Sequence, residues 1–155
     1  MTYQFMKPRE AAAVSDLVWK VFEEFEAGDY KQEGIDEFKK YIDPEYLATR
    51  VADGTLSVLC CKSGGETVGV IAIKDDRHIS LLFVRKEDQR KGIARTLVEM
   101  ALRMCKRINP HLREITVNSS PYAVGIYEKL GFEHTGPEQE KNGIRFTPMR
   151  LAIGL

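Results

Sequence analysis

Hydrophobic residues return every three or four positions in two stretches of the first third of the chain. The first stretch follows Pro8 and carries Val14, Leu17, Val18, Val21, Phe22 and Phe25. This spacing puts them on one face and predicts an amphipathic helix that begins near the proline. Residues 35–51 are predicted to be helical with a break at Asp43-Pro44, because proline has no N–H to donate, and Gly54 ends this region.

Runs rich in β-branched residues follow, with turn residues between them. Residues 56–61 and 67–73 are joined by the turn 63–66, Ser-Gly-Gly-Glu, which predicts a hairpin. A third strand is predicted at residues 78–84, after the turn Asp-Asp-Arg at 75–77. A further short strand, residues 3–5, precedes the first helix.

The helical period returns at Gly92. The apolar stripe of this segment consists of Ile93, Ala94, Leu97, Val98, Ala101, Leu102 and Cys105. It predicts a central helix that ends at Asn109-Pro110.

The last part of the chain alternates again between strand and helix. Residues 114–118 are predicted to form a strand. Ser120 is predicted to cap the next helix with Pro121 in its first turn, and Gly131 to end it. Two antiparallel strands, 132–135 and 144–153, are expected to complete the chain.

The order strand, two helices, three strands, helix, strand, helix, two strands predicts an α/β (α+β) fold. Its antiparallel strands come first and a strand-helix-strand crossover lies in the middle, so the sheet should be mixed, with about seven strands and helices on both faces. No long linker or repeat divides the sequence, and a single domain over residues 1–155 is expected.

The composition argues against a nucleic-acid-binding, membrane-spanning, secreted or metal-binding protein. Lys plus Arg number 23 and Asp plus Glu number 23, so the net charge of zero gives no global field toward nucleic acid or a membrane surface. The apolar run at 68–73 is far too short to span a bilayer and residues 1–8 lack a signal-peptide core, which predicts a cytoplasmic protein. Cys60 and Cys61 should point to opposite sides of a strand, and no Cys or His pair has the spacing of metal ligands, so buried reduced thiols and no metal are expected.

The segment Gln89, Arg90, Lys91, Gly92, Ile93, Ala94 and Arg95 lies between a predicted strand and the start of the central helix. A helix N-terminus presents unpaired N–H groups and a partial positive charge, and a glycine lets a bulky anion approach the backbone. Three basic residues at this end oppose the helix dipole, a conflict that a bound phosphate or pyrophosphate would resolve. The alternative is a solvated basic turn. The sequence has neither the Gly-Lys-Ser/Thr ending of a P-loop nor three glycines in dinucleotide spacing.

Two segments resemble motifs of the GNAT superfamily of N-acetyltransferases. Residues 89–94 are similar to the pattern Gln/Arg-x-x-Gly-x-Gly/Ala that holds the pyrophosphate of CoA, with Ala94 as the permitted variant. Residues 119–132, Ser-Ser-Pro-Tyr-Ala-Val-Gly-Ile-Tyr-Glu-Lys-Leu-Gly-Phe, are similar to the family's Asn-x-x-Ala-x-x-x-Tyr-x-x-x-Gly-Phe, with Ser120 at the place of Asn. The resemblance covers residues 56–135 and implies a GNAT-type twisted sheet.

The resemblance also implies a set of site residues. In the family, a bulged strand binds the pantetheine arm through its backbone, and the strand end that matches is Leu82, Phe83 and Val84. The backbone of residues 90–95 would bind the pyrophosphate, and Asn118, Ser120 and Ala123 are further candidates for cofactor contacts. Tyr127 matches the family's general acid, and His78 stands where several members place a glutamate base, with Ser80 or a water molecule as alternatives.

Two functions stay open at this stage. The first is acetyl transfer from acetyl-CoA to a primary amine of a small molecule or peptide, and the second is a catalytically silent CoA-binding sensor or interaction module. Acidic residues at the end of the first helix would suit a cationic amine, although a solvated face explains them equally well: Glu23, Glu24, Glu26 and Asp29. A homodimer is possible, through an edge strand at residues 144–153.

Overall fold

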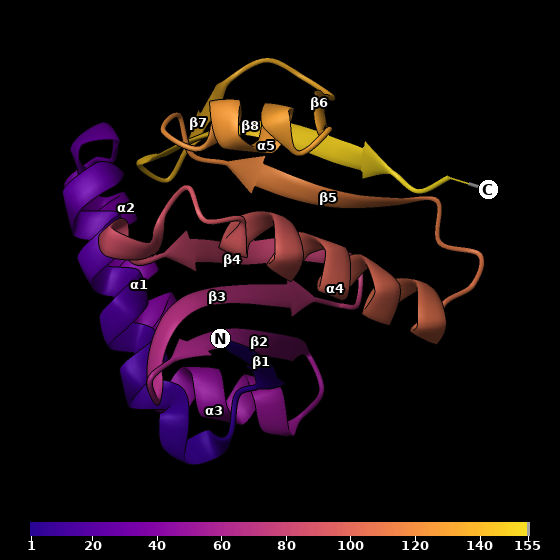
Figure 1. Cartoon of the computed structure of the whole chain (residues 1–155). Helices are drawn as coiled ribbons and strands as arrows, with labels where there is room; N and C mark the ends of the chain where they lie inside the picture. Colours follow the sequence, from indigo (N-terminus) through magenta and orange to yellow (C-terminus); the bar gives the residue numbers. More distant parts are fainter. Residues whose placement is uncertain (155) are drawn as a thin grey trace.

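A twisted sheet forms the centre of the molecule, and the computed structural model describes residues 1–154 (Figure 1). Its strands follow the order β1-β2-β3-β4-β5-β8-β6, and β7 pairs with β8 beside this path. The strands are β1 (Thr2–Phe5), β2 (Leu56–Ser63), β3 (Glu66–Lys74), β4 (His78–Val84), β5 (Glu114–Ser119), β6 (Glu133–His134), β7 (Gln139–Lys141) and β8 (Ile144–Ala152). The pairing of β4 with β5 is parallel and the others are antiparallel, which confirms the mixed, mostly antiparallel sheet.

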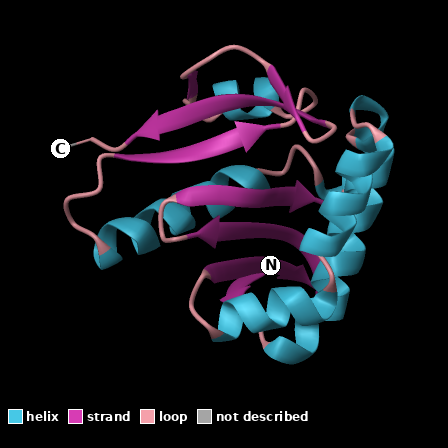
Figure 2. Cartoon of the chain, turned by 180° about the vertical axis from the view of Figure 1, so that it is seen from behind, coloured by secondary structure: helices cyan, strands magenta, loops and turns pink. Residues whose placement is uncertain are grey.

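Helices cover both faces of the sheet, as predicted. The helices are α1 (Ala11–Phe25), α2 (Gln32–Tyr41), α3 (Pro44–Ala52), α4 (Ile93–Ile108) and α5 (Val124–Lys129), with short 3-10 turns at Pro8–Glu10, Ala27–Asp29 and Lys86–Asp88. In Figure 1, α4 crosses in front of β3 and β4, and in Figure 2, which shows the molecule from behind, α1, α2 and α3 lie on the near side.

Side-chain alternation along the strands divides the core between these two faces. Cys61 and Ile71 belong to the cluster under α4, whereas Cys60 and Val70 belong to the cluster under α1. Such burial on both faces explains why β2 and β3 are apolar almost throughout, since each side of the strand meets a helix. The predicted break between α2 and α3 falls at Asp43-Pro44, where the Asp43 side chain accepts a hydrogen bond from the Tyr46 N–H.

The parallel strands β4 and β5 pair over a short distance only. His78 pairs with Thr116 and Ile79 with Val117, and beyond this point the two strands diverge toward the end of the sheet near α1 (Figure 1). An irregularity in the register with β3 leaves Ser80 unpaired between Ile79 and Leu81, so β4 carries a bulge where the divergence begins. This divergence opens the sheet at the C-terminal end of β4.

Three features differ from the sequence-based predictions. The helix after Ser120 begins only at Val124, because the Ser120 hydroxyl and carbonyl accept the Ala123 N–H and close a turn first. The polar loop after β6 contains an extra short strand, β7. Strand β8 pairs with β5 and also with β6 and β7, so it is not the edge strand that the sequence predicted at residues 144–153, and the homodimer itself stays a prediction.

Candidate active site

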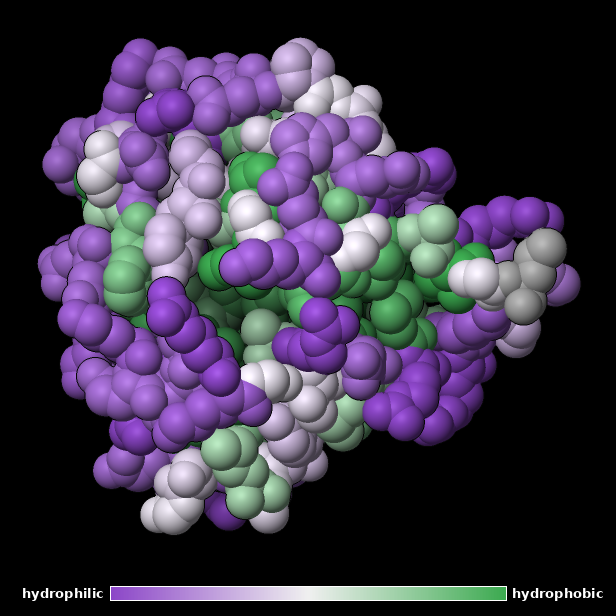
Figure 3. Space-filling view, turned by 45° about the horizontal axis from the view of Figure 1, so that its top comes forward, coloured by the Kyte–Doolittle hydropathy of each residue, from purple (hydrophilic) through white to green (hydrophobic). Residues whose placement is uncertain are grey.

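A cleft of about 460 Å³ lies where β4 and β5 diverge, between the start of α4 and α5. A volume of this size falls in the range of small-molecule and cofactor sites, roughly 300–1,000 Å³. Figure 3 shows a hollow with a hydrophobic floor that runs between hydrophilic rims on this face of the molecule. Apolar residues of the lining include Leu82, Ile93, Ala94 and Leu130, so the cleft can hold a long and partly apolar group.

The first turn of α4 forms one end of the cleft. Gly92 is the N-cap in a left-handed conformation with φ 82°, and Arg90 has φ 65°. Lys91 lies between these two left-handed residues, and successive N–H groups in such a turn make a concavity for anions. Within the described chain, no backbone hydrogen bond engages the N–H groups of Arg90, Lys91 or Gly92. A Cβ added at Gly92 would enter open space beside these donors, so the glycine keeps the approach to them clear.

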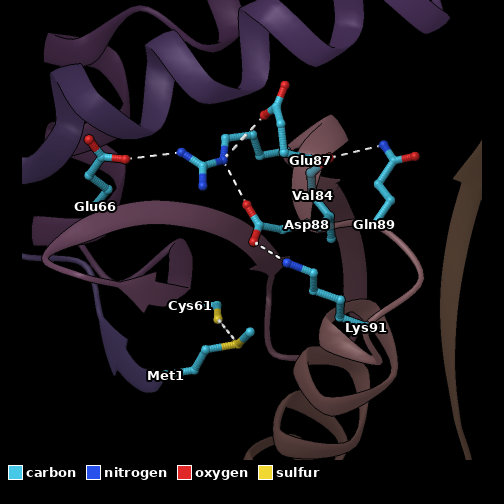
Figure 4. A network of polar contacts seen from close by, with 9 residues as sticks. Met1, Cys61, Glu66, Val84, Glu87, Asp88, Gln89 and Lys91 are labelled. Atoms are coloured by element: carbon cyan, nitrogen blue, oxygen red, sulfur yellow. Dashed lines mark hydrogen bonds and ion pairs between the residues drawn. The ribbon is translucent and has the colours of Figure 1, made fainter.

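Buried Asp88 organises the loop that precedes this turn. Its carboxylate pairs with the Arg85 guanidinium at 2.7 Å and with the Lys91 ammonium at 3.2 Å, as Figure 4 shows for Asp88 and Lys91. The pKa of Asp88 is lowered, chiefly by its hydrogen bond to Arg85. The positive charge of Lys91 is therefore balanced by a carboxylate of the protein itself. Among the described residues, no ion pair engages Arg90, which leaves its charge available to a ligand in the cleft.

Tyr127 lies on the opposite wall, on α5, and is 4% exposed. Its ring packs edge-on against Phe132 with centroids 5.1 Å apart, and no hydrogen bond to another described residue occupies its hydroxyl. Burial raises the pKa of Tyr127 far above its ordinary range, and the nearby charge of Glu26 raises it further. The phenol thus stays protonated at neutral pH and can act as a donor.

Glu26, at the C-terminal end of α1, contributes a carboxylate to the same cleft. The residue is 7% exposed, and burial raises the pKa of its carboxyl from 4.5 to about 7. A hydrogen bond from the Ser120 side chain lowers this pKa, and the like charge of Asp29 raises it. No cationic side chain of residues 1–154 forms an ion pair with Glu26, which is unusual for a buried carboxylate.

Aromatic stacking closes the cleft on the α1 side. The rings of Phe25 and Tyr122 stack with centroids 4.9 Å apart, which ties the end of α1 to the loop between β5 and α5. This contact brings Glu26 of α1 and Tyr127 of α5 to one cleft although they are distant in the sequence.

The structure brings most of the predicted site residues together. The cleft is lined by the predicted Leu82, Phe83, Val84, Gln89, Arg90, Gly92, Ile93, Ala94, Arg95, Ala123 and Tyr127. Two of these side chains have structural partners: Gln89 Nε2 donates to the Val84 carbonyl at 3.1 Å, and an Arg95 nitrogen donates to the Lys129 carbonyl at 3.3 Å. Lys91, Asn118 and Ser120 do not line the cleft, because Lys91 pairs with Asp88, Asn118 is exposed on β5, and Ser120 contacts Glu26 and Ala123 instead.

His78 lies away from this cleft. It begins β4, while the cleft is lined by Leu82–Val84 at the other end of the strand, and four residues of strand span roughly 13 Å. Its Nδ1 is 2.7 Å from the Thr116 hydroxyl, and it lines a separate pocket with Lys74 and Arg77. The pKa of His78 is lowered, first by burial and then by these two charges. His78 therefore does not line the cleft that contains Tyr127.

Sequence reasoning gave no specific role to Glu26, Tyr122 or Asp88. Glu26 was one of four acidic residues at the end of α1, and nothing in the sequence separates it from its neighbours. In the structure the other three acidic residues lie elsewhere: Glu23 and Glu24 line a charged surface pocket, and Asp29 pairs with Arg145. The sequence contains one signal for the burial of Glu26. It follows Phe22 by four positions and therefore lies on the same, buried face of the helix.

The residues present fit a cosubstrate that ends in phosphates and continues as a thin, partly apolar arm. Free N–H groups and Arg90 at the start of α4 suit the phosphates, and the diverging end of β4 leaves an apolar channel for the arm. Tyr127 lies at the far wall with a hydroxyl that stays protonated at neutral pH. The fold and site thus define the class of protein: a transferase whose acyl group is delivered by a coenzyme A thioester.

Comparison with known proteins agrees with this class. The model of an acetyltransferase (GNAT) domain matches residues 26–153, and the chain therefore belongs to the GNAT acetyltransferase family. It is an N-acetyltransferase that uses acetyl-CoA. No curated protein sequence matches the chain significantly.

Solved structures show the same fold at low sequence identity. The GCN5-related N-acetyltransferase of Rhodopseudomonas palustris is 20% identical with a TM-score of 0.82, over 98% of this chain and 95% of that one. The PaiA N-acetyltransferase of Thermoplasma acidophilum, solved in complex with coenzyme A, is 19% identical with a TM-score of 0.77, over 99% and 100% of the two chains. The ribosomal-protein-alanine N-acetyltransferase of Brucella melitensis is 16% identical with a TM-score of 0.69, over 99% and 100%.

Among residues 1–154, no group of three or more His, Cys, Asp or Glu is placed to hold a metal ion. In the same part of the chain, no helix has the length and apolar character needed to cross a membrane.

Proposed function

We propose that the protein transfers acetyl from acetyl-CoA to a primary amine of a small molecule or peptide, by direct attack of the amine, with Tyr127 as the general acid. The observation that carries this proposal is the position of Tyr127. A protonated phenol with no partner among the described residues stands in the cleft opposite a helix end that is open to anions.

The bound cosubstrate supplies an acetyl thioester, and this chain's residues would hold it by its two ends. The N–H groups and Arg90 at the start of α4 would bind the phosphates. The diverging backbone of Leu82–Val84 offers hydrogen-bonding groups to the amides of the arm, because β5 does not pair with this part of β4.

Acetyl transfer needs a proton for the sulfur that departs from the acetyl carbon. Tyr127 lines the cleft wall and can give one, since its raised pKa keeps the hydroxyl protonated over the physiological range. A phenol held in contact with the leaving sulfur contributes by position, which compensates for its weak acidity.

The cytoplasm is the proposed compartment. Cys60, Cys61 and Cys105 are buried, free thiols, which suits the reducing conditions of that compartment.

The test is thiol release from acetyl-CoA in the presence of polyamines, amino acids, aminoglycosides and short peptides, with a no-amine control. We expect release above background with at least one class, and saturable CoA binding by calorimetry. CoA binding without turnover of any amine would contradict the enzyme and favour a sensor module. Absence of CoA binding would contradict the assigned site.

A further inference from the structure

Glu26 is a buried charged residue of the cleft that the proposed function leaves without a role. Its carboxylate is removed from water, and within residues 1–154 the charged group that acts on it most is another carboxylate, Asp29. A buried charge without a counter-ion is costly, so an ordinary structural residue at this position would be apolar. A cation that enters the cleft would supply the missing counter-charge.

Its position relative to Tyr127 is the second argument. Both side chains line the same cleft, and the charge of Glu26 acts on the Tyr127 hydroxyl. Transfer of an acetyl group between them requires that a proton leave the amine on one side while another reaches the sulfur on the other side. One carboxylate and one phenol in a single cleft meet both requirements.

We propose that Glu26 is the catalytic base of this enzyme, and that its buried carboxylate binds the acceptor as a cationic primary ammonium and accepts its proton. This inference rests on the proposed function. It places the acceptor amine at the end of the cleft formed by α1 and the Phe25–Tyr122 stack.

The proton balance closes with these two residues. Glu26 takes one proton from the ammonium and passes it to solvent. The neutral nitrogen forms the C–N bond as the C–S bond breaks, and Tyr127 delivers its proton to the departing sulfur. The second proton that leaves nitrogen goes to Glu26, and from Glu26 to the Tyr127 phenolate. The products are the amide, the free thiol and one proton in solvent, and both side chains return to their starting states.

The surroundings of Glu26 suit this task. A carboxyl with a pKa near 7 rather than 4.5 is a stronger base by roughly 300-fold, yet it is still largely ionised just above neutral pH. The titratable and charged groups that face it from neighbouring elements are Asp29, Tyr30, Tyr122, Tyr127 and Arg90. Of these, Asp29 raises the pKa of Glu26, and the tyrosines remain neutral in this range.

Glu26→Gln tests the proposal, with Glu23→Gln as the matched control because Glu23 is exposed on the same helix. With an alkylamine acceptor at pH 7.5, kcat/KM of E26Q should fall by roughly 10²–10⁴-fold, the range of general acid–base catalysis. With hydroxylamine, which is uncharged at this pH and needs no deprotonation before attack, the loss should be far smaller. The rise of wild-type kcat/KM through about pH 7 should be absent in E26Q. CoA affinity by calorimetry should be unchanged in both variants.

Equal activity of E26Q and wild type with the alkylamine would overturn the base, and so would equal losses with both nucleophiles. If the wild type turns over no amine at all, the proposed function fails separately. In that case carboxyl ¹³C NMR of wild type against E26Q still decides on Glu26: a carboxyl that titrates in the ordinary range would overturn its assignment.

Discussion

Individual residues of the site owe their chemical states to burial. Tyr127 and Glu26 are both removed from water, which favours the neutral form of each group and raises both pKa values. For the Tyr127 phenol this keeps the protonated form at neutral pH, and for the Glu26 carboxylate it increases the affinity for a proton. Sequence alone could not assign these states, because desolvation is set by the residues that surround a group in space.

Tyr127→Phe should lower kcat by roughly 10²–10⁴-fold, because it removes the proton donor, while CoA affinity changes little. Tyr41→Phe is the matched control: the Tyr41 hydroxyl is buried without a partner among the described residues and lies outside the cleft. Steady-state kinetics of thiol release and calorimetry measure both effects. Equal kcat for Y127F and wild type would contradict the acid assignment.

Glu26→Gln should also stabilise the protein, and more so at higher pH. The folded pKa of about 7 exceeds the unfolded value of 4.5, so the native state binds more protons between these values and stability falls as pH rises through this window. Above pH 7, the ionised carboxylate costs at most about 3 kcal/mol, a cost that Gln does not carry. Urea unfolding at pH 5 and pH 8 tests this, and a stability difference that is the same at both pH values would contradict it.

Among the elements, the turn at the start of α4 has a backbone conformation that suits anion binding. Asp88 pairs with Lys91 in this turn, Arg90 and Gly92 have positive φ and line the cleft, and their N–H groups have no backbone partner in the described chain. The sequence predicted an anion site here, and the structure adds the reason that three basic residues are tolerated: Lys91 pairs with Asp88, and an Arg95 nitrogen bonds to a carbonyl of α5.

Gly92→Ala should lower CoA affinity by about tenfold or more, because it adds a Cβ to a residue that lines the cleft at the proposed phosphate site. Gly54→Ala is the control, since Gly54 has the same φ of 82° and also has open space around its Cβ position. Both substitutions should cost about 1–2 kcal/mol of stability through backbone strain. Calorimetry of CoA binding separates them, and equal affinities would contradict the role of this turn.

At the scale of the whole molecule, the C-terminal hairpin closes onto the N-terminal helices. The Lys31 N–H donates to the Gly143 carbonyl at 2.9 Å, Lys31 pairs with Glu140 at 2.7 Å, and Arg145 pairs with Asp29 at 3.4 Å. These contacts join β7 and β8 to the segment between α1 and α2, which adjoins Glu26. Residues 29–31 and 140–145 are thereby joined close in sequence to Glu26, which lines the cleft.

Gly34→Ala should weaken the contact between α2 and the turn between β7 and β8. A Cβ at Gly34 would lie 2.5 Å from the Gly143 carbonyl oxygen, which is backbone and cannot rotate away. We expect a loss of roughly 1–3 kcal/mol from this clash, larger than the ~1 kcal/mol that alanine normally adds in a helix. The Lys31 amide should also exchange faster with solvent. Gly28→Ala, with nothing near its Cβ position, is the control. A stable G34A variant with unchanged exchange would contradict this account.

The sequence by itself determined the main helices and strands, and it predicted an anion site at the start of α4. Hydrophobic period gave the helices, the strands and the two-faced sheet, because burial follows local spacing. The order of strand, basic glycine turn and helix indicated the anion site, because the donors of a helix end are local.

Tertiary structure alone decided which side chains share the cleft. His78 and Leu82 belong to one strand, yet only Leu82 reaches the cleft, because β4 and β5 diverge after their first two pairs. Glu26 lies about a hundred residues before Tyr127 in the chain, and the packing of α1 against the β5–α5 loop places both in one cleft. Such proximity, and the loss of water that raises both pKa values, depends on long-range packing that no local pattern encodes.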